Sequence, residues 1–444
     1  MKTFTHFFGP VSKRWEGLPD PRKPESPEDV VYSVGSPVFL GVLMFACRLG
    51  ARRPVRFELF TAFLVDLYKV PFDVDGVPHG DPMNGVLCGR PFDGVQEAVT
   101  GMTETLIDKK VLYPHRLFER DYVVAVDATG MLVCRYPHCP HCLTSTHPGE
   151  TVYYHPVLEA KVVTPTGFVF SLPSEFIENP EGGPSKSEQQ RKQGCELKAF
   201  YRLAARRHAR FPRLPLLLDM DGPYAVGPVF DLCRRYGWKY TIALTDDPLT
   251  SVNEEFESLA AVTPENRLTW RMGREGEIHP RLRWVNDIRY VDSERREHRL
   301  SVVECLDTRP GEHQELKTTK FKWGTNVPAS PNNVAPLANE GGRVRGKIEN
   351  EGFNVQKNGG YNLEHAYTED EPGMKIYCLL LQIAHLLVPL MEKGSLLRAA
   401  FPRGFGSART LARRLLEALR NASLPREQYD DLCAHPIQIR FNSS

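Results

Sequence analysis

The chain has 444 residues, of which 41% are hydrophobic and 25% are charged, and its formal net charge at pH 7 is +1. This length exceeds one ordinary hydrophobic core, so we expect two or three packed units of a globular protein. The near-neutral charge argues against a protein that coats nucleic acid with its whole surface. Lys and Arg nevertheless cluster in 191–213 and 398–420, where they fit either phosphate contacts or solvated helix faces.

The N-terminal sequence MKTFTHFFGPVSKRWEG has no secretory signal, because it lacks an apolar core followed by a small-residue cleavage site. The most apolar stretches, 37–47 and 376–391, are shorter than the roughly 20 residues that span a bilayer. Ten cysteines without secretory features indicate reduced thiols. We therefore expect a cytoplasmic protein with no membrane partner.

The first 118 residues are expected to be mainly helical. Apolar runs of helix length occur at 38–49, 57–68 and 95–106, and joints rich in Pro and Gly, such as 18–22, separate them.

After residue 118 the pattern changes to that of strands. The β-branched run 122–126 predicts a buried strand that delivers Asp127 at its end. A further strand is expected at 131–134. Residues 158–163 and 168–172 are expected to form a hairpin around a Pro-Thr-Gly turn.

A long helix is expected at 186–210, and 214–218 reads as another buried strand, which ends at Asp219-Met-Asp221-Gly. A helix at 224–236 and a strand at 239–244 follow. Acidic residues thus stand at the ends of two strands separated by a helix. This order is compatible with an α/β fold of the ribonuclease-H-like type, which has a mixed sheet.

Short alternating segments between turn residues at 245–340 predict a β-rich insertion, and helical character returns at about residue 346. The expected organisation is a helical N-terminal region (1–118), a catalytic core (119–244 and 341–395), the insertion (245–340) and a basic helical C-terminal tail (396–444).

The acids at the strand ends fit a site for divalent cations. Phosphoryl transfer on DNA uses two divalent metals, and Mg²⁺ prefers oxygen ligands, usually a few carboxylates with water and phosphate. Asp127 is the first candidate ligand. Asp219 and Asp221 compete for the second position, because they lie only two residues apart.

The third acid is expected in the stretch 343–357, which contains Glu349 and Glu351. On a helix, Arg345, Glu349 and Phe353 share one stripe, whereas Glu351 points nearly the opposite way. Only one of the two glutamates can reach a common metal. We choose Glu349, because Arg345 on the same stripe can hold its carboxylate or a phosphate.

Several motifs resemble those of bacterial insertion-sequence transposases with a DDE catalytic domain. They are VVAVDATG, HCPHCLTSTH with YYHPVLEAKVV, SLPSEFIEN, QGCELKAFYRLA, DMDGPYA and RGKIENEGFNVQKNGGYNLEH, and the likeness covers most of 120–392.

In that family the third acid belongs to a helix that carries Tyr, Arg, Glu and Lys at characteristic spacing. Arg345 and Glu349 match the Arg and Glu, and Lys357 lies one residue later than the usual Lys, with Gln356 in its place. The Tyr position is Gly342.

Two further positions bear on the comparison with the family. The Trp that commonly follows the Arg is replaced by Gly346. The family also has an aromatic residue three positions after its second acid, which Asp221 with Tyr224 satisfies and Asp219 does not.

The resemblance implies that Asp127, Asp221 and Glu349 bind Mg²⁺ (or Mn²⁺) and that Arg345 and Lys357 contact DNA. The implied reaction is cleavage at the transposon ends by activated water, followed by attack of the freed 3′-hydroxyl on target DNA. The implied partners are the transposon ends, bound by the N-terminal helical region, and the target DNA. A homodimer in the DNA complex and a place at the bacterial nucleoid are also implied.

A cluster of cysteines and histidines fits a structural Zn²⁺. Cys139 and Cys142 form a C-x-x-C knuckle, and tetrahedral zinc takes thiolates on such a tight turn. His147, His155 and Cys195 are candidates for the remaining ligands. Free thiols or a redox pair are the alternatives, although no thioredoxin-like context surrounds the motif.

Two other functions remain open beside the transposase. Gly342 and Gly346 favour a domesticated DNA-binding derivative that has lost catalysis, whereas the three acids argue against it. A metal-dependent nuclease without strand transfer would share the same carboxylates.

Overall fold

A computed structural model describes the chain from 1 to 441 except for 16–17, 19, 21–31, 60–68, 73–76, 79, 89–90, 138–140, 148, 178–187, 245–248, 274–277, 311–314 and 436. Most of the predicted helix at 57–68 and the joint at 18–22 lie outside the described residues.

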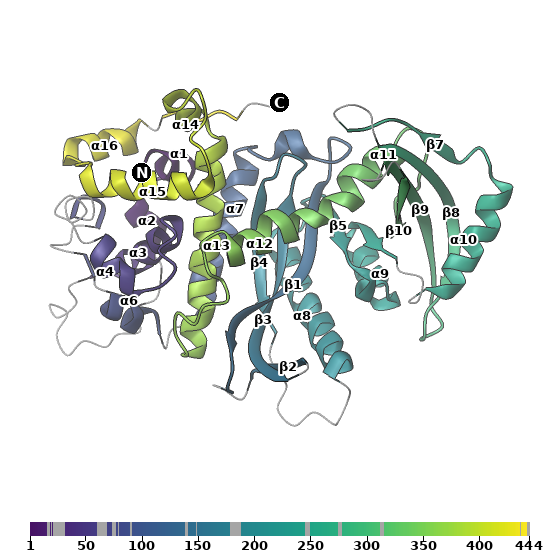
Figure 1. The fold of residues 1–444 in the computed structure, drawn as a ribbon, viewed down its shortest axis with the longest axis horizontal. Helices are drawn as coiled ribbons and strands as arrows, with labels where there is room; N and C mark the ends of the chain where they lie inside the picture. The colour runs from purple at the N-terminus through teal and green to yellow at the C-terminus, as the bar shows by residue number, and fades with distance from the viewer. Residues whose placement is uncertain are drawn as a thin grey trace.

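One large mixed sheet forms the centre of the protein, which confirms the α/β class (Figure 1). Its order is β2-β3-β1-β5-β6-β10-β9-β8-β7, with β4 paired to β3. The strands of the core are β1 (Tyr122–Cys134), β2 (Leu143–His147), β3 (Glu150–Val163), β4 (Val169–Phe176), β5 (Leu216–Met220) and β6 (Lys239–Ala243). The strands of the insertion are β7 (Arg267–Thr269), β8 (His279–Val291), β9 (Glu297–Pro310) and β10 (Leu316–Thr325).

The core of the sheet matches the predicted order, with the hairpin β3–β4 and the parallel neighbours β1, β5 and β6. The prediction was wrong about the start of this order. β1 continues through 131–134 instead of ending at Asp127, because it stays paired antiparallel with β3 beyond that residue. Asp127 therefore lies within β1, opposite Glu159 of β3.

Helices gather at one end of the protein, beside the central strands (Figure 1). From the N-terminal region come α1 (Lys2–Phe8), α2 (Val11–Trp15), α3 (Gly35–Ala46), α4 (Arg53–Glu58), α6 (Gly80–Leu87), α7 (Asp93–Asp108) and the 3₁₀ turn η2 (Tyr113–His115). The C-terminal part adds α13 (Glu371–Lys393), α14 (Ser395–Ala400), α15 (Ala408–Asn421) and α16 (Arg426–Ala434).

Helix α13 joins these helices to the sheet, since it contacts α3 and α7 on one side and β4 on the other. Asp370 begins the helix by accepting a hydrogen bond from the backbone N–H of Gly373. In length and composition α13 could cross a membrane, but 89% of its most apolar window is buried inside the protein. We therefore regard it as a core helix.

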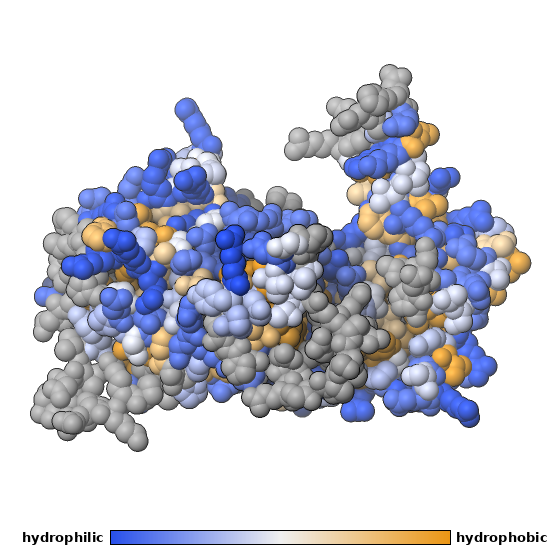
Figure 2. All heavy atoms as spheres, turned by 60° about the horizontal axis from the view of Figure 1, so that its bottom comes forward, coloured by the Kyte–Doolittle hydropathy of each residue, from blue (hydrophilic) through white to orange (hydrophobic). Residues whose placement is uncertain are grey.

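The remaining helices of the core lie along the sheet. They are α8 (Glu188–Arg210), the 3₁₀ turn η3 (Gly222–Tyr224) and α9 (Gly227–Tyr236). Helix α9 ends at Gly237, whose φ of 66° is the left-handed conformation that glycine adopts readily. Over one face of the protein, hydrophilic side chains predominate between small groups of hydrophobic ones, as expected for a surface in water (Figure 2).

The insertion continues the central sheet, because β10 pairs antiparallel with β6. It is β-rich, as predicted, but it also contains α10 (Thr250–Val262), which the sequence analysis missed. Strand β8 is continuous, with a register shift in its pairing with β9 between Val285 and Ile288.

Helical structure returns earlier than predicted and is irregular. It begins with α11 (Val334–Pro336), continues through η4 (Leu337–Gly342), η5 (Arg343–Arg345) and η6 (Ile348–Phe353), and ends with α12 (Asn354–Asn358). Both η4 and η6 are π-helical, and η5 is a 3₁₀ turn. The prediction of a regular α-helix through Glu349 was therefore wrong. π-Helical turns within helices are frequent at functional sites.

Candidate active site

The parallel register of the sheet places Asp127 and Asp221 at equivalent positions. The pairing between β1 and β5 ends at Ala125 and Asp219. Asp127 lies two residues beyond Ala125, and Asp221 lies two residues beyond Asp219. Two neighbouring parallel strands thus each provide one carboxylate just beyond the end at which their pairing stops. The competing Asp219 is fully buried and accepts a hydrogen bond from the Thr241 hydroxyl at 3.2 Å.

Arg345 forms ion pairs with both Asp127 and Glu349, the first and third of the predicted acids. Its Nη1 lies 3.4 Å from Asp127 Oδ2, and its Nη2 lies 2.9 Å from Glu349 Oε1. The guanidinium thus bridges two of the three predicted acids, each within ion-pair distance. Desolvation lowers the pKa of Arg345, but the charges of Asp221, Asp127 and Glu349 outweigh it and raise the pKa. The guanidinium therefore pairs with two carboxylates, Asp127 and Glu349, and also interacts electrostatically with Asp221 and Asp219.

Glu351 points away from this group, as the helical spacing predicted. Its carboxylate pairs with Lys347 Nζ at 2.5 Å, one turn earlier. The choice of Glu349 over Glu351 is therefore consistent with the side-chain directions, even though the helix is not regular. Lys357, the predicted DNA contact, instead pairs with Glu364 at 2.7 Å.

The pKa of Asp127 is raised to about 6, chiefly because the carboxyl is partly buried. Arg345 and the backbone N–H of Ala128, which donates to Asp127 Oδ1 at 2.9 Å, lower this pKa, whereas the charges of Glu349 and Glu196 raise it. A cation placed beside the acid would favour its ionised form. Raised carboxyl pKa values of this kind are common at functional sites.

A buried polar network supports the helix that carries Glu349. Lys161 Nζ donates to Ser171 Oγ at 2.6 Å and to Gln382 Oε1 at 2.7 Å, and it lies 3.4 Å from Glu159 Oε2. Gln356, at the place of the family's Lys, donates to Gln382 Oε1 at 2.8 Å. Glu159 is the β-sheet partner of Asp127. The network therefore connects this residue pair of the sheet to α12 and α13.

One backbone contact fixes the π-helical turn. His385 of α13 donates from Nε2 to the carbonyl oxygen of Glu351 at 3.0 Å. Burial lowers the pKa of His385 to about 3, so the ring is neutral and its tautomer is set by this hydrogen bond. The carbonyl group of Glu351 thereby has a partner outside its own helix.

The zinc prediction can be followed only in part. Cys139 lies outside the described residues, and so do the side chains of His147 and Cys195. Cys142 is buried, and its Sγ lies 3.5 Å from His155 Nε2. The structure thus brings one thiol of the knuckle to one of the predicted histidines, a pairing that fits a zinc ligand set.

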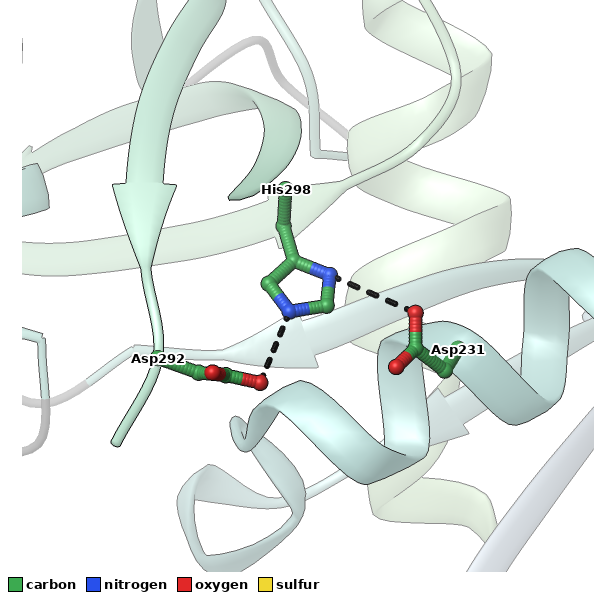
Figure 3. Close-up of side chains that lie close together, drawn as sticks. All are labelled: Asp231, Asp292 and His298. Atoms are coloured by element: carbon green, nitrogen blue, oxygen red, sulfur yellow. Dashed lines mark hydrogen bonds and ion pairs between the residues drawn. The ribbon is translucent and has the colours of Figure 1, made fainter. Parts of the chain in front are cut away.

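A second group that could hold a metal was not predicted from the sequence. Asp231 of α9 and Asp292 and His298 of the β8–β9 hairpin have ligand atoms within 4.8 Å of one another (Figure 3). His298 Nε2 lies 3.0 Å from Asp292 Oδ2, and its Nδ1 lies 3.8 Å from Asp231 Oδ1. Asp231 is distant from the hairpin in sequence, and no spacing rule would have joined the three.

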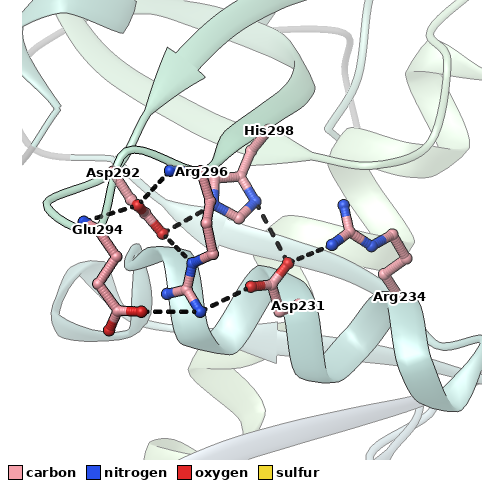
Figure 4. Close-up of polar contacts among 6 residues, drawn as sticks. All are labelled: Asp231, Arg234, Asp292, Glu294, Arg296 and His298. Carbon is pink, nitrogen blue, oxygen red and sulfur yellow. Dashed lines mark hydrogen bonds and ion pairs between the residues drawn. The ribbon is translucent and has the colours of Figure 1, made fainter.

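Arginine side chains already neutralise this second group (Figure 4). Arg296 contacts Asp292 at 2.8 Å and Asp231 at 3.1 Å, and Asp292 Oδ1 also accepts the backbone N–H groups of Glu294 and Arg296. Burial raises the pKa of Asp292, but these hydrogen bonds and the one from His298 together hold it well below its usual range. We read the group as a tether between α9 and the hairpin, because a metal would have to displace Arg296.

Gly227 fits the same reading. A Cβ atom there would lie 1.9 Å from Asp292 Oδ2, so only glycine lets the hairpin approach the start of α9 so closely.

Comparison with known proteins adds no family to this picture. No model of a known protein family matches the chain, and no curated protein matches it either. The likeness to insertion-sequence transposases therefore rests on the motifs of the sequence.

Proposed function

We propose that this chain is a DNA transposase of the DDE type, with a ribonuclease-H-like core, which cleaves transposon ends and joins them to target DNA. The observation that carries the proposal is the pair of contacts from Arg345 to Asp127 and Glu349, together with the β1–β5 register, which ends two residues before Asp127 and Asp221. These are the acids that the family motifs select. They come from two neighbouring parallel strands and from the helix after a β-rich insertion.

The donor set suits a hard divalent cation, since every candidate ligand is a carboxylate oxygen. Mg²⁺ or Mn²⁺, when bound, would supply activation of the attacking hydroxyl and stabilisation of the leaving oxygen. Arg345 already neutralises part of the acids' charge without a metal. When DNA enters, the guanidinium of Arg345 can turn from a carboxylate to a backbone phosphate, which can accept two hydrogen bonds from it.

The test uses purified protein, Mg²⁺ or Mn²⁺, and DNA that carries the sequences flanking its gene. We expect nicks that leave 3′-hydroxyl ends at inverted repeats, and joining of those ends to a second DNA. Glu349→Gln should abolish cleavage. The matched control Glu351→Gln should retain it, because Glu351 pairs with Lys347 away from the site. Cleavage that persists in Asp127→Ala would refute the proposed site.

The same assay separates the two other functions. A nuclease without strand transfer would cut but not join. A domesticated derivative, which Gly342 and Gly346 favoured in the sequence, would bind the ends without cutting them.

We also propose a structural Zn²⁺ that includes Cys142, on the strength of its contact with His155. Protein purified without chelators should release zinc to a chromogenic chelator after denaturation. Cys142→Ser should lower that amount strongly, whereas Cys433→Ser, at a partly buried cysteine of the C-terminal tail, should not. Equal zinc in both variants would contradict the proposal.

A further inference from the structure

An ion pair joins the insertion to the helical segment that carries Glu349 (337–358, here called the Glu349 segment). Arg343 of this segment forms two hydrogen bonds with Asp307 of β9. Its Nη1 lies 2.5 Å from Oδ2, and its Nη2 lies 2.6 Å from Oδ1. Such a bidentate pair fixes the direction of both side chains. The side chain of Arg343 is 18% exposed and that of Asp307 is 12% exposed, so salt and water screen the pair little.

Two more side chains of the insertion contact the guanidinium of Arg343. Its Nη2 also donates to Cys305 Sγ at 3.0 Å, and its central carbon lies 4.5 Å from the ring centroid of Phe321. Phe321 of β10 is the β-sheet partner of Cys305, and Asp307 follows Cys305 by two residues. Cys305, Asp307 and Phe321 therefore share one face of the insertion's sheet. This face offers an acid, a thiol and an aromatic ring to one arginine.

Arg343 stands where the Glu349 segment changes its helical form. The π-helical η4 ends at Gly342, and the 3₁₀ turn η5 begins at Arg343. The two preceding residues also meet strands of the sheet. The Thr241 hydroxyl of β6 lies 3.2 Å from the carbonyl oxygen of Gly341, and the indole of Trp323 in β10 lies against Gly342. Three successive residues are thus held by three different strands.

The helical form of η5 sets the direction of the residues that follow it. A 3₁₀-helix turns by about 120° per residue and an α-helix by about 100°, so three residues that relaxed to the α form would rotate the rest of the segment by about 60°. Arg345 is the last residue of η5, and its guanidinium contacts Asp127 and Glu349. A rotation of this size would turn Arg345 and Glu349 away from β1.

We propose that the insertion positions Glu349 for catalysis and that Arg343 is the positioning residue. The ion pair with Asp307 holds η5 in the 3₁₀ form, which directs Arg345 and Glu349 toward β1. This inference rests on the proposed function, because it takes Glu349 as an acid of the active site. It gives the insertion a task in the reaction, although the three proposed acids all lie outside it.

The test measures the rate constant of DNA cleavage at saturating DNA, the affinity for DNA, and the affinity of the full chain for Mn²⁺ without DNA. Arg343→Lys keeps a positive charge beside Asp307 but cannot form the bidentate pair. Its cleavage rate constant should fall roughly tenfold to a hundredfold, because a misplacement of about 1 Å can cost that much. Its dissociation constant for Mn²⁺ should rise by roughly two- to tenfold, the effect of losing one hydrogen bond. DNA affinity should not change, because Arg343 faces the insertion.

Arg283→Lys is the matched control in the same insertion. Arg283 pairs with Glu304 at 2.6 Å, and Glu304 faces the opposite side of β9 because it precedes Cys305 by one residue. Both variants weaken an ion pair of the insertion, so urea denaturation should show similar losses of stability. Only Arg343→Lys should cleave more slowly and bind Mn²⁺ more weakly.

A second variant of the pair covers the case in which Arg343→Lys does not fold. Asp307→Asn keeps the shape of the side chain, removes its charge, and should slow cleavage to a similar extent. The double variant should cleave no more slowly than the slower single variant, because both changes remove the same contact.

The outcomes separate this role of Arg343 from the proposed function. If Arg343→Lys and Asp307→Asn cleave as fast as Arg283→Lys, or if Arg283→Lys is slowed as much as they are, the positioning role is refuted and the three-acid site stands. If the wild type does not cleave, or if Asp127→Ala cleaves as the wild type does, the proposed function fails and the role of Arg343 fails with it.

Discussion

Replacing Gly342 by alanine should destabilise the protein, although glycine within a helical segment normally costs stability. A Cβ atom at this position would lie 2.5 Å from Trp323 Cε2 and 2.6 Å from its Nε1. Trp323 is 4% exposed and stacks on Phe321, with 5.8 Å between the ring centroids, so the indole has little room to move. One of the two residues must therefore shift.

The expected size follows from two opposing effects. Overpacking of a well-filled core costs about 1–3 kcal/mol, whereas Gly→Ala in a helix gains about 0.5–1 kcal/mol. Gly342 has φ −96° and ψ −42°, which alanine adopts without strain, so the gain applies in full. We expect a net loss of about 1 kcal/mol in the free energy of unfolding, within a range of about 0–2.5 kcal/mol.

Gly346→Ala is the matched control in the next turn. Its Cβ would meet only Asn350 Nδ2 at 3.8 Å, and its φ of −54° is helical. It should be neutral or gain up to about 1 kcal/mol. Urea denaturation of both variants, and of each combined with Trp323→Leu, measures the difference. The reasoning is refuted if Gly342→Ala is as stable as Gly346→Ala, or if Trp323→Leu does not relieve the loss.

Two further predictions concern buried charges. Asp127→Asn should raise the free energy of unfolding of the metal-free protein at pH 8 but not at pH 4. Because burial raises the folded-state pKa of Asp127 to about 6, its ionisation destabilises the fold progressively as the pH rises from about 4 through 6. Urea denaturation across this range measures it, and a gain that does not depend on pH would contradict the reasoning. Lys161→Met should cost about 3–5 kcal/mol, since it leaves the fully buried Glu159 without its cation. Adding Glu159→Gln should recover part of that loss, and a double variant no more stable than Lys161→Met alone would argue against the pairing.

The sequence predicted the parts of the site that depend on local pattern. The run before Asp127 is β-branched and the run before Asp219 is leucine-rich, so both strands could be expected, and their order followed from the helix between them. The aromatic spacing chose Asp221 over Asp219. The structure adds a physical reason for that choice, since Asp219 is still within the paired strand and turned into the core.

Other features depend on tertiary contacts and carry no local signal. The prediction that Arg345, Glu349 and Phe353 share one face assumed an α-helix with about 100° per residue. In the structure η6 is π-helical, and His385 of α13 donates a hydrogen bond to a backbone carbonyl of this turn. The hydrogen bond from Tyr224 to Glu196 forms only because α8 packs beside η3, and polar residues on a helix most often face solvent. The attachment of β10 to β6 likewise depends on strand pairing far apart in the chain.

The glycine at position 342 is therefore weak evidence for a decayed enzyme. If a residue had been lost there, the space that it vacated should be empty, but Trp323 of the insertion fills it. The aromatic group next to this turn thus comes from β10, and a Tyr side chain at 342 would collide with it. Gly346 differs, because only Asn350 approaches its Cβ direction. A Gly346→Trp variant should consequently fold. If it raises the yield of cleaved ends in the DNA assay, the absence of Trp at this position limits cleavage. If it changes nothing in a protein that cleaves, the three acids and Arg345 support cleavage without that residue.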